Sequence, residues 1–252
     1  MKNVSILGCG WLGKELAISL IAKGYQVQGS TTSEERLEEL KAVNICPFLI
    51  DIAEEKINQE FLHADLLVIA ITSKEVEDFR RLIASIEKSK IGTVIFISST
   101  SVYPSMNKVM TEEDETADAP LVDIEKLFRN NTAFSTTIIR FAGLFGGKRH
   151  PGNWFANRKI PHPKGYVNMI HREDCIAIIE QIMEQTMFGE VFNACANHHP
   201  TREEFYINAR KSLGKPAPEF DTSKPLEYKI ISSEKLQKTL HYQFKHNNLC
   251  SL

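Results

Sequence analysis

The chain has 252 residues, of which 42% are hydrophobic and 25% are charged, and its formal net charge at pH 7 is −2. This length suits one large domain, or one domain with a smaller appendage, and the composition is typical of a globular protein. The nearly balanced charge, without a basic stripe that carries interleaved aromatic residues, argues against a nucleic-acid partner.

Cysteines and hydrophobic runs bear on the cellular compartment. The five cysteines are scattered and form no Cys-x-x-Cys pair, so we expect reduced thiols and no metal site. No apolar run approaches the roughly 20 residues that cross a bilayer, and glycines interrupt the first segment, which could otherwise be mistaken for a signal peptide. We therefore expect a cytoplasmic protein without a membrane partner.

Short apolar strands alternate with helical patterns through the first two thirds of the chain. Strands are predicted at Val4–Leu7, Tyr25–Gly29, Pro47–Asp51, Leu66–Ile71, Thr93–Ser98 and Thr136–Arg140. Helices are predicted between them at Leu12–Ala22, from Thr32 to Leu40, at Glu75–Ser89 and at Val122–Asn130. This alternation predicts the α/β class, with a Rossmann-type doubly wound parallel sheet.

The last third has a looser pattern. After a loop over residues 143–168, helices at Asp174–Gln185, Arg202–Ser212 and Glu234–Thr239 mix with short strands near Val191–Asn193 and Tyr228–Ile231. We expect residues 1–142 to form mainly the NAD(P)-binding core. Residues 143–252 are expected to form mainly a smaller α/β substrate lobe, interwoven with the last strands and helices of the core.

A glycine-rich loop joins the first predicted strand to the first helix. Its sequence, Gly8-Cys9-Gly10-Trp11-Leu12-Gly13, has the pattern G-x-G-x-x-G. The first glycine permits a tight turn, the second leaves room for a pyrophosphate, and the third lets the helix pack closely on the strand. The helix N-terminus then offers N–H groups to the phosphates. We predict that Gly8, Gly10, Trp11, Leu12 and Gly13 bind a dinucleotide.

The end of the second strand favours NADP over NAD. NAD sites usually carry an acid there for the ribose 2′-hydroxyl, whereas this chain has Ser30, Thr31 and Thr32, with no acid before Glu34. Arg36 follows one turn later and could hold a 2′-phosphate. Alternatively, Thr32 caps the helix and Arg36 is solvated.

Asp51 ends the third strand, where it could meet the adenine ring or serve as a turn residue.

The fifth strand ends in the hydroxyl-rich sequence ISSTSVYP, Ile97 to Pro104. Five segments occur in the order seen in the extended short-chain dehydrogenase/reductase superfamily, and the chain resembles that superfamily over essentially its whole length. These segments are the glycine loop, SSTSVYP, IIRFAGLFG, VNMIHRED and YKIISSEKL. Within it, GCGWLG, GSTTS and HPGNWFA resemble an atypical bacterial branch of NAD-dependent epimerase/dehydratase-like proteins.

The resemblance implies a catalytic site that is incomplete in this chain. Ser99 matches the residue that positions the substrate oxygen, and Lys126 matches the lysine of Tyr-x-x-x-Lys, which holds the nicotinamide ribose. Val122, however, occupies the tyrosine position, and no lysine of the chain has a tyrosine four residues before it. Tyr103, at the rim of the same strand, and His171 are the other candidates for proton transfer, although His171 could equally be a hydrogen-bonded hinge.

Two functions follow from these patterns. The first is an NAD(P)-dependent oxidoreductase or epimerase/dehydratase-like enzyme that acts on a small polar, sugar-nucleotide-like molecule, with NADP favoured and NAD allowed. The second is a non-catalytic NADP(H)-binding or redox-sensing protein. Both are compatible with a homodimer.

Overall fold

The computed structural model describes residues 3–54, 57–155 and 158–251, so Ala156 of the HPGNWFA motif lies outside the described residues. The chain divides into two compact units. Unit 1 comprises Met1–Ser98, Asp118–Ile139 and Ile179–Val191, and unit 2 comprises Ser99–Ala117, Arg140–Ile178 and Phe192–Leu252.

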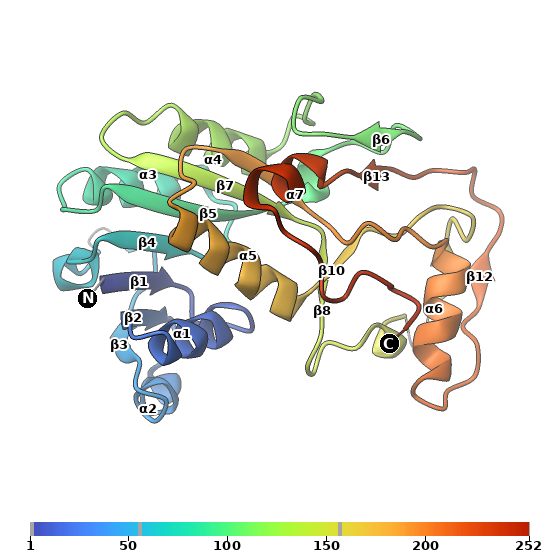
Figure 1. The fold of residues 1–252 in the computed structure, drawn as a ribbon, viewed down its shortest axis with the longest axis horizontal. Helices are drawn as coiled ribbons and strands as arrows, with labels where there is room; N and C mark the ends of the chain where they lie inside the picture. The colour runs from blue at the N-terminus through green and yellow to red at the C-terminus, as the bar shows by residue number, and fades with distance from the viewer. Residues whose placement is uncertain (1–2, 55–56, 156–157, 252) are drawn as a thin grey trace. The chain divides into compact units, whose positions relative to one another are not determined.

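Among the described residues, seven strands form the central sheet in the order β11-β7-β5-β4-β1-β2-β3 (Figure 1). Their bounds are β1 Asn3–Leu7, β2 Gln26–Thr31, β3 Cys46–Leu49, β4 Leu66–Ile69, β5 Thr93–Ser99, β7 Ser135–Phe141 and β11 Val191–Ala194. Pairing is parallel from β5 through β4, β1 and β2 to β3. The order reverses at β1, which confirms the predicted Rossmann-type sheet.

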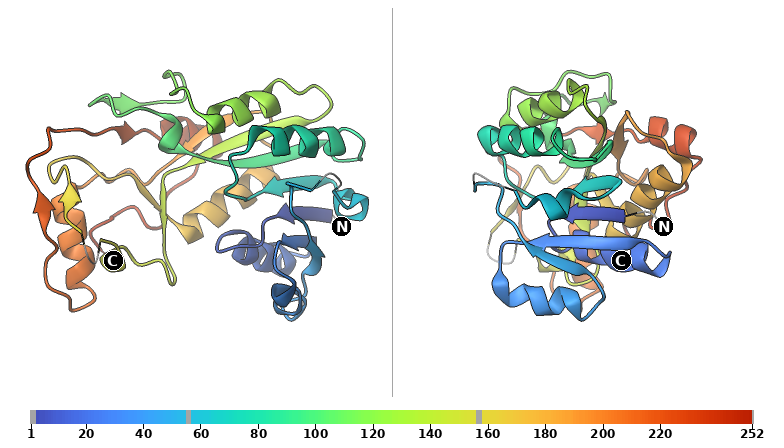
Figure 2. Two further views of the ribbon diagram at one scale, coloured as in Figure 1. Left: turned by 180° about the vertical axis from the view of Figure 1, so that it is seen from behind. Right: turned by 90° about the vertical axis from the view of Figure 1, so that its left-hand side faces the viewer.

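Helices cover the sheet of unit 1. They are α1 Gly13–Ala22, α2 Leu37–Lys41, α3 Val76–Ile86 and α4 Pro120–Arg129, while α5 Arg172–Gln185 passes from unit 2 into unit 1. Figure 2 shows α3 and α4 side by side. Phe79 of α3 and Phe128 of α4 lie edge to face at 6.1 Å, and Phe128 stacks on Phe96 of β5 at 5.0 Å. These buried aromatic side chains join the two helices to the sheet.

Unit 2 is built from short strand pairs and two further helices. β6 Val109–Met110 pairs with β13 Ile230–Ile231, β8 Gly143–Phe145 with β10 Met169–His171, and β9 Ile160–Pro161 with β12 Phe220–Asp221. The helices are α6 Arg202–Lys211 and α7 Glu234–Leu240. Phe145, Ile160, Phe205 and Leu249 belong to its hydrophobic core.

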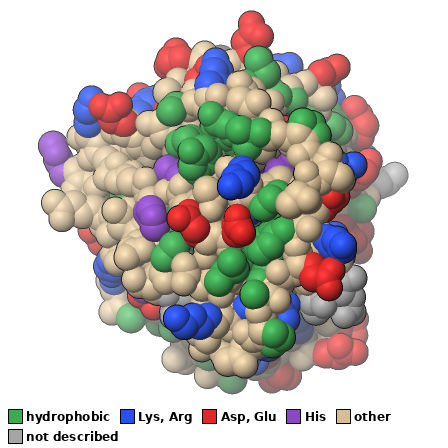
Figure 3. Space-filling model, turned by 90° about the vertical axis from the view of Figure 1, so that its right-hand side faces the viewer, with side chains coloured by type: hydrophobic (Ala, Val, Ile, Leu, Met, Phe, Trp, Pro, Cys, Tyr) green, Lys and Arg blue, Asp and Glu red, His purple; other side chains and the backbone are tan. Residues whose placement is uncertain are grey.

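Some hydrophobic side chains reach the surface, and Figure 3 shows several gathered on one face of the molecule. Met106, Val109 and Leu226 of unit 2 are the most exposed large ones described, each more than half exposed. Asn107 joins their two segments, because its side chain donates to the Leu226 carbonyl and accepts from the Tyr228 N–H. Separately, no helix within the described residues combines the length and hydrophobicity needed to span a bilayer.

Candidate functional site

The glycine loop of unit 1 has the geometry of a dinucleotide site. Gly8 has a φ of +99°, and a Cβ atom there would lie 2.7 Å from the Ala70 carbonyl oxygen. A Cβ atom on Gly13 would lie 2.2 Å from the Gly8 carbonyl oxygen. Around Gly10, by contrast, no described atom lies within 4 Å of such a Cβ, and the residue is exposed. The fold itself requires the outer glycines, while Gly10 leaves open the space that a pyrophosphate would fill.

The loop is fastened to β2 through Ser30. The Cys9 N–H donates to the Ser30 carbonyl at 2.7 Å, and the Gly8 N–H donates to the Ser30 hydroxyl at 2.9 Å. Ser30 and Thr31 are buried, and the Thr31 hydroxyl accepts the Ser33 N–H at 3.2 Å. The hydroxyl oxygens of Ser30 and Thr31 thus hold the loop and the following turn, and their contact with a 2′-phosphate stays a prediction.

Thr32 is exposed, and the predicted helix cap at this residue is wrong. The segment starts as a 3₁₀ turn, Glu34–Arg36, after Ser33, whose side chain makes no capping bond. Thr32 therefore remains available to a ligand.

Two cations flank the glycine loop. Arg36 donates through Nη2 to the Cys9 carbonyl at 2.8 Å, and its Nε pairs with Glu39 Oε2 at 3.3 Å. Lys14, in the first turn of α1, pairs with the other carboxylate oxygen of Glu39. The hydrogen bonds from Lys14 and then Arg36 hold the pKa of Glu39 below its ordinary value. Arg36 is thus fixed against the loop, where sequence analysis had left it either solvated or at the phosphate.

The other predicted cofactor residues have different environments. Leu12 is buried and precedes α1, and it gives this helix end no side-chain cap. Trp11 is partly exposed beside it. Asp51 is exposed, and its Oδ1 accepts the Ala53 N–H at 3.0 Å, which closes the turn after β3. An anion is favoured at this end of α1.

Helix α4 presents a glutamate, not the predicted lysine, to the sheet. Ser98 of β5 donates to Glu125 at 2.5 Å, and Glu125 is only 2% exposed. The Lys126 side chain is 63% exposed and pairs with Asp123 at 3.2 Å. Val122 is buried. The expectation that Lys126 lies on the face of α4 toward β5 is wrong, because each residue of a helix is rotated by about 100° from the one before.

In unit 2, Ser99 is oriented at the start of the 3₁₀ turn Thr100–Val102. Its hydroxyl oxygen accepts the Ser101 N–H at 3.1 Å and the residue is partly exposed. The hydroxyl hydrogen can therefore still be donated to a ligand oxygen, as the resemblance implies.

Lys229 contacts the same turn and was missed by the sequence analysis. Its Nζ donates to the carbonyls of Thr100 at 2.9 Å and Tyr103 at 2.5 Å. Burial lowers the pKa of Lys229, and no carboxylate of the described residues lies within 4.0 Å of its Nζ. Its position in the YKIISSEKL motif was the only signal in the sequence.

Tyr103 belongs to a buried network. Its hydroxyl donates to Asn193 Oδ1 at 2.9 Å and accepts from Arg140 Nη1 at 2.6 Å, and the residue is 2% exposed. Glu112 accepts the Asn193 N–H at 2.6 Å. Burial raises the pKa of Tyr103, although Arg140 acts against this. The expectation that Tyr103 lies at an accessible rim is wrong, and its proton is already committed to Asn193.

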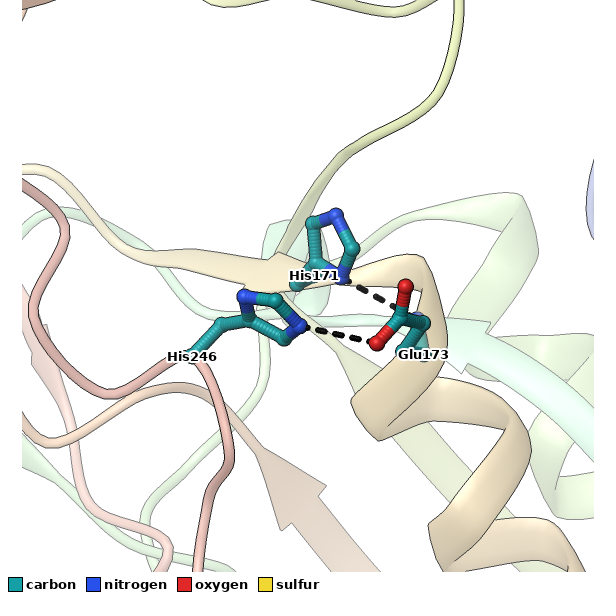
Figure 4. Close-up of side chains that lie close together, drawn as sticks. All are labelled: His171, Glu173 and His246. Carbon is teal, nitrogen blue, oxygen red and sulfur yellow. Dashed lines mark hydrogen bonds and ion pairs between the residues drawn. The ribbon is translucent and has the colours of Figure 1, made fainter. Parts of the chain in front are cut away.

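His171 ends β10 and caps the start of α5 (Figure 4). Its Nδ1 accepts the Glu173 N–H at 3.3 Å, and its ring lies on that of His246 with centroids 3.7 Å apart. His246 Nε2 pairs with Glu173 at 3.0 Å. Burial, and then His246, lowers the pKa of His171. These contacts favour the interpretation of His171 as a hydrogen-bonded hinge over its interpretation as a proton-transfer residue.

His171, Glu173 and His246 also bring three potential metal ligands within 4.8 Å of one another. However, Nδ1 of His171 already accepts an N–H group of the α5 N-terminus, and the positive end of a helix dipole disfavours a cation. We therefore assign no metal ion to this cluster.

Sequence comparison places the chain among known proteins. It is 31% identical to Protein YeeZ of Escherichia coli strain K12 over 265 residues, which cover 98% of this chain and 97% of that protein. The chain belongs to the YeeZ family. A family model described as "NADP oxidoreductase coenzyme F420-dependent" matches residues 3–101, which in this YeeZ family member run from β1 to the Ser99 turn.

Solved structures share the fold of this YeeZ family member. A conserved protein of unknown function from Silicibacter pomeroyi aligns with a TM-score of 0.83 and 18% identity, over 99% of this chain and 96% of that chain. UDP-glucuronic acid 4-epimerase from Bacillus cereus, in complex with UDP-glucuronic acid and NAD, aligns with a TM-score of 0.81 and 17% identity, over 98% and 95%. These likenesses show that the chain has the same fold as an NAD-binding epimerase.

Proposed function

We propose that this protein is an NADP(H)-dependent oxidoreductase or epimerase/dehydratase-like enzyme that acts on a small polar, sugar-nucleotide-like molecule. The observation that carries the proposal is the glycine loop, in which the outer glycines are required by packing and Gly10 faces open space. A bound nicotinamide coenzyme would supply or accept hydride, and the residues of the chain would position it and the substrate.

The preference for NADP rests on charge around the loop. β2 ends without an acidic residue, and Arg36 and Lys14 flank the place where an adenosine ribose would lie. Thr32 is the exposed hydroxyl beside them. The name of the matching family model agrees with NADP, whereas the structure of the Bacillus cereus epimerase contains NAD.

On the substrate side, Ser99 carries the proposal. Its oxygen is fixed by the Ser101 N–H, so its hydrogen can be aimed at a carbonyl or hydroxyl oxygen of the substrate. The complex of the Bacillus cereus epimerase with UDP-glucuronic acid supports a sugar-nucleotide-like substrate class.

Calorimetric titration with NADP⁺ and NAD⁺ tests the coenzyme assignment. We expect tighter binding of NADP⁺, and Arg36→Ala should weaken it about tenfold through loss of a charge-assisted contact while changing NAD⁺ binding little. Arg80→Ala is the matched control, because Arg80 pairs with Glu77 on the exposed side of α3. Equal or tighter binding of NAD⁺ by the parent protein would refute the NADP assignment.

A non-catalytic NADP(H)-binding or redox-sensing protein is the second candidate. Three observations favour it. Lys126 is exposed, Val122 is buried, and the Tyr103 hydroxyl already donates its hydrogen bond to Asn193. Oxidation of NADPH should be followed with a panel of carbonyl compounds that includes keto sugar nucleotides. Turnover that falls in Ser99→Ala at unchanged coenzyme affinity supports the enzyme, whereas tight binding without turnover supports the second candidate.

A further inference from the structure

Glu39 lies between the two cations at the glycine loop. One of its carboxylate oxygens pairs with Lys14, and the other pairs with Arg36 at 3.3 Å. Arg36 at the same time donates to the Cys9 carbonyl within the loop. The carboxylate therefore occupies a position where two positive side chains converge beside the predicted dinucleotide.

The contact with Lys14 is not a local helix pair. Lys14 lies 25 residues before Glu39, whereas the neighbouring Glu38 pairs with Lys41 three residues along the same short helix. Lys14 is the least exposed side chain of the three, at 22%, while those of Arg36 and Glu39 are 36% and 46% exposed. All three side chains are therefore in contact with solvent, so an anion in solution can compete with Glu39 for the two cations.

We propose that Glu39 is a built-in counter-ion that competes with the 2′-phosphate of NADP for Lys14 and Arg36, and so limits the preference for NADP over NAD. This inference rests on the proposed function, because it takes the 2′-phosphate to lie beside these two cations. In the free protein the carboxylate offsets one of the two positive charges and pairs with both cations. On binding, the phosphate brings more charge and three acceptor oxygens, and it displaces a single carboxylate.

The size of the effect follows from Coulomb's law. In water, a unit charge about 4 Å from another changes the affinity by about fivefold. NAD has no 2′-phosphate, so it would meet the freed cations only through its pyrophosphate, which would lie near Lys14 at the α1 N-terminus in both coenzymes. Removing the Glu39 charge should therefore change binding of NADP⁺ much more than binding of NAD⁺.

The test is calorimetric titration of parent and Glu39→Gln protein with both coenzymes, at low and at high ionic strength. We expect Glu39→Gln to bind NADP⁺ about fivefold more tightly and NAD⁺ within about twofold of the parent. The gain should shrink at high salt, because screening weakens exposed charges. Glu38→Gln makes the same charge change one residue earlier, away from the loop, and should leave both affinities unchanged.

The outcomes separate the inference from the proposed function. If the parent binds NADP⁺ and Glu39→Gln binds it equally or more weakly, Glu39 is a scaffold for the cations and the inference is overturned. An equal gain in Glu38→Gln would also overturn it, since a general change in net charge would then explain the result. If neither parent nor variant binds NADP⁺ but both bind NAD⁺, the NADP assignment itself fails and the inference fails with it.

Discussion

Gly10→Val separates the fold of the glycine loop from its binding function. No described atom lies within 4 Å of a Cβ atom at Gly10, and its φ is not in the left-handed region. The substitution should therefore change the free energy of unfolding by less than about 0.5 kcal/mol, as is usual for exposed positions. The same change at Gly13 would place the Cβ 2.2 Å from the Gly8 carbonyl oxygen and should disturb the fold itself.

The effect on binding should be large. A valine side chain at Gly10 would fill the space needed by the pyrophosphate, so we expect NADP⁺ affinity to fall at least about 100-fold, or about 2.7 kcal/mol. In the parent protein, NADP⁺ at about 100 times its Kd should stabilise the fold by about 2.7 kcal/mol. For a chain of this size that corresponds to a rise in Tm of about 5–10 °C.

The assay is thermal unfolding with and without NADP⁺, together with calorimetric titration. Gly10→Val should show nearly the parent Tm without ligand and no rise with it. Gly92→Val is the matched control, because Gly92 is also exposed, has no atom within 4 Å of a Cβ and lies between α3 and β5. If Gly10→Val binds NADP⁺ with the affinity of the parent, the loop is only a turn and the coenzyme site is misplaced.

Two further predictions follow from the site, and a third concerns His199, a partly buried residue of unit 2 whose Nδ1 lies 3.2 Å from the Val167 carbonyl oxygen. Tyr103→Phe removes the hydroxyl that links Arg140 to Asn193, so the free energy of unfolding, measured in urea, should fall by about 1–3 kcal/mol; a loss below about 0.5 kcal/mol would contradict the network. Lys126→Ala should leave NADP⁺ affinity within about twofold, because Lys126 is exposed, and a large loss in titration would show that it reaches the coenzyme. Burial lowers the pKa of His199, so the unfolded state binds more protons and stability should fall as pH drops through about 6.5; His199→Gln should flatten this slope in urea unfolding at several pH values, and an unchanged slope would contradict the assignment.

Much of the fold could be predicted from the sequence because β1, β4 and β7 are nearly continuous buried runs. β1, β4 and β5 were placed within two residues of their observed ends, and the alternation with helices fixed the parallel sheet. In unit 2, the strand predicted near Tyr228–Ile231 is found at Ile230–Ile231, but the strand at Ile160–Pro161 was missed because such a short segment has no periodicity. Its partner strand, Phe220–Asp221, is about sixty residues away in the chain, so nothing local marks the pair.

The candidate site also has parts that the sequence predicts and parts that it does not. The glycine loop was predictable because its requirements are set within six consecutive residues. The orientation of Lys126 depends on which face of α4 packs on the sheet, and a one-residue shift along a helix changes the face. Lys229 could not be predicted, since it reaches the Tyr103 carbonyl across 126 residues of chain. Sequence spacing describes local geometry well and contacts between distant segments poorly.

The Ser99 turn bears most directly on whether the protein is an enzyme. Its hydroxyl accepts one N–H, and among the described residues no acceptor receives its hydrogen. The Lys229 ammonium lies on the carbonyls that follow Ser99 and has no carboxylate partner among those residues, which makes the turn electropositive. A substrate oxygen could accept the Ser99 hydrogen beside this positive charge, so we expect turnover of NADPH that depends on Ser99, even though no tyrosine supplies the proton.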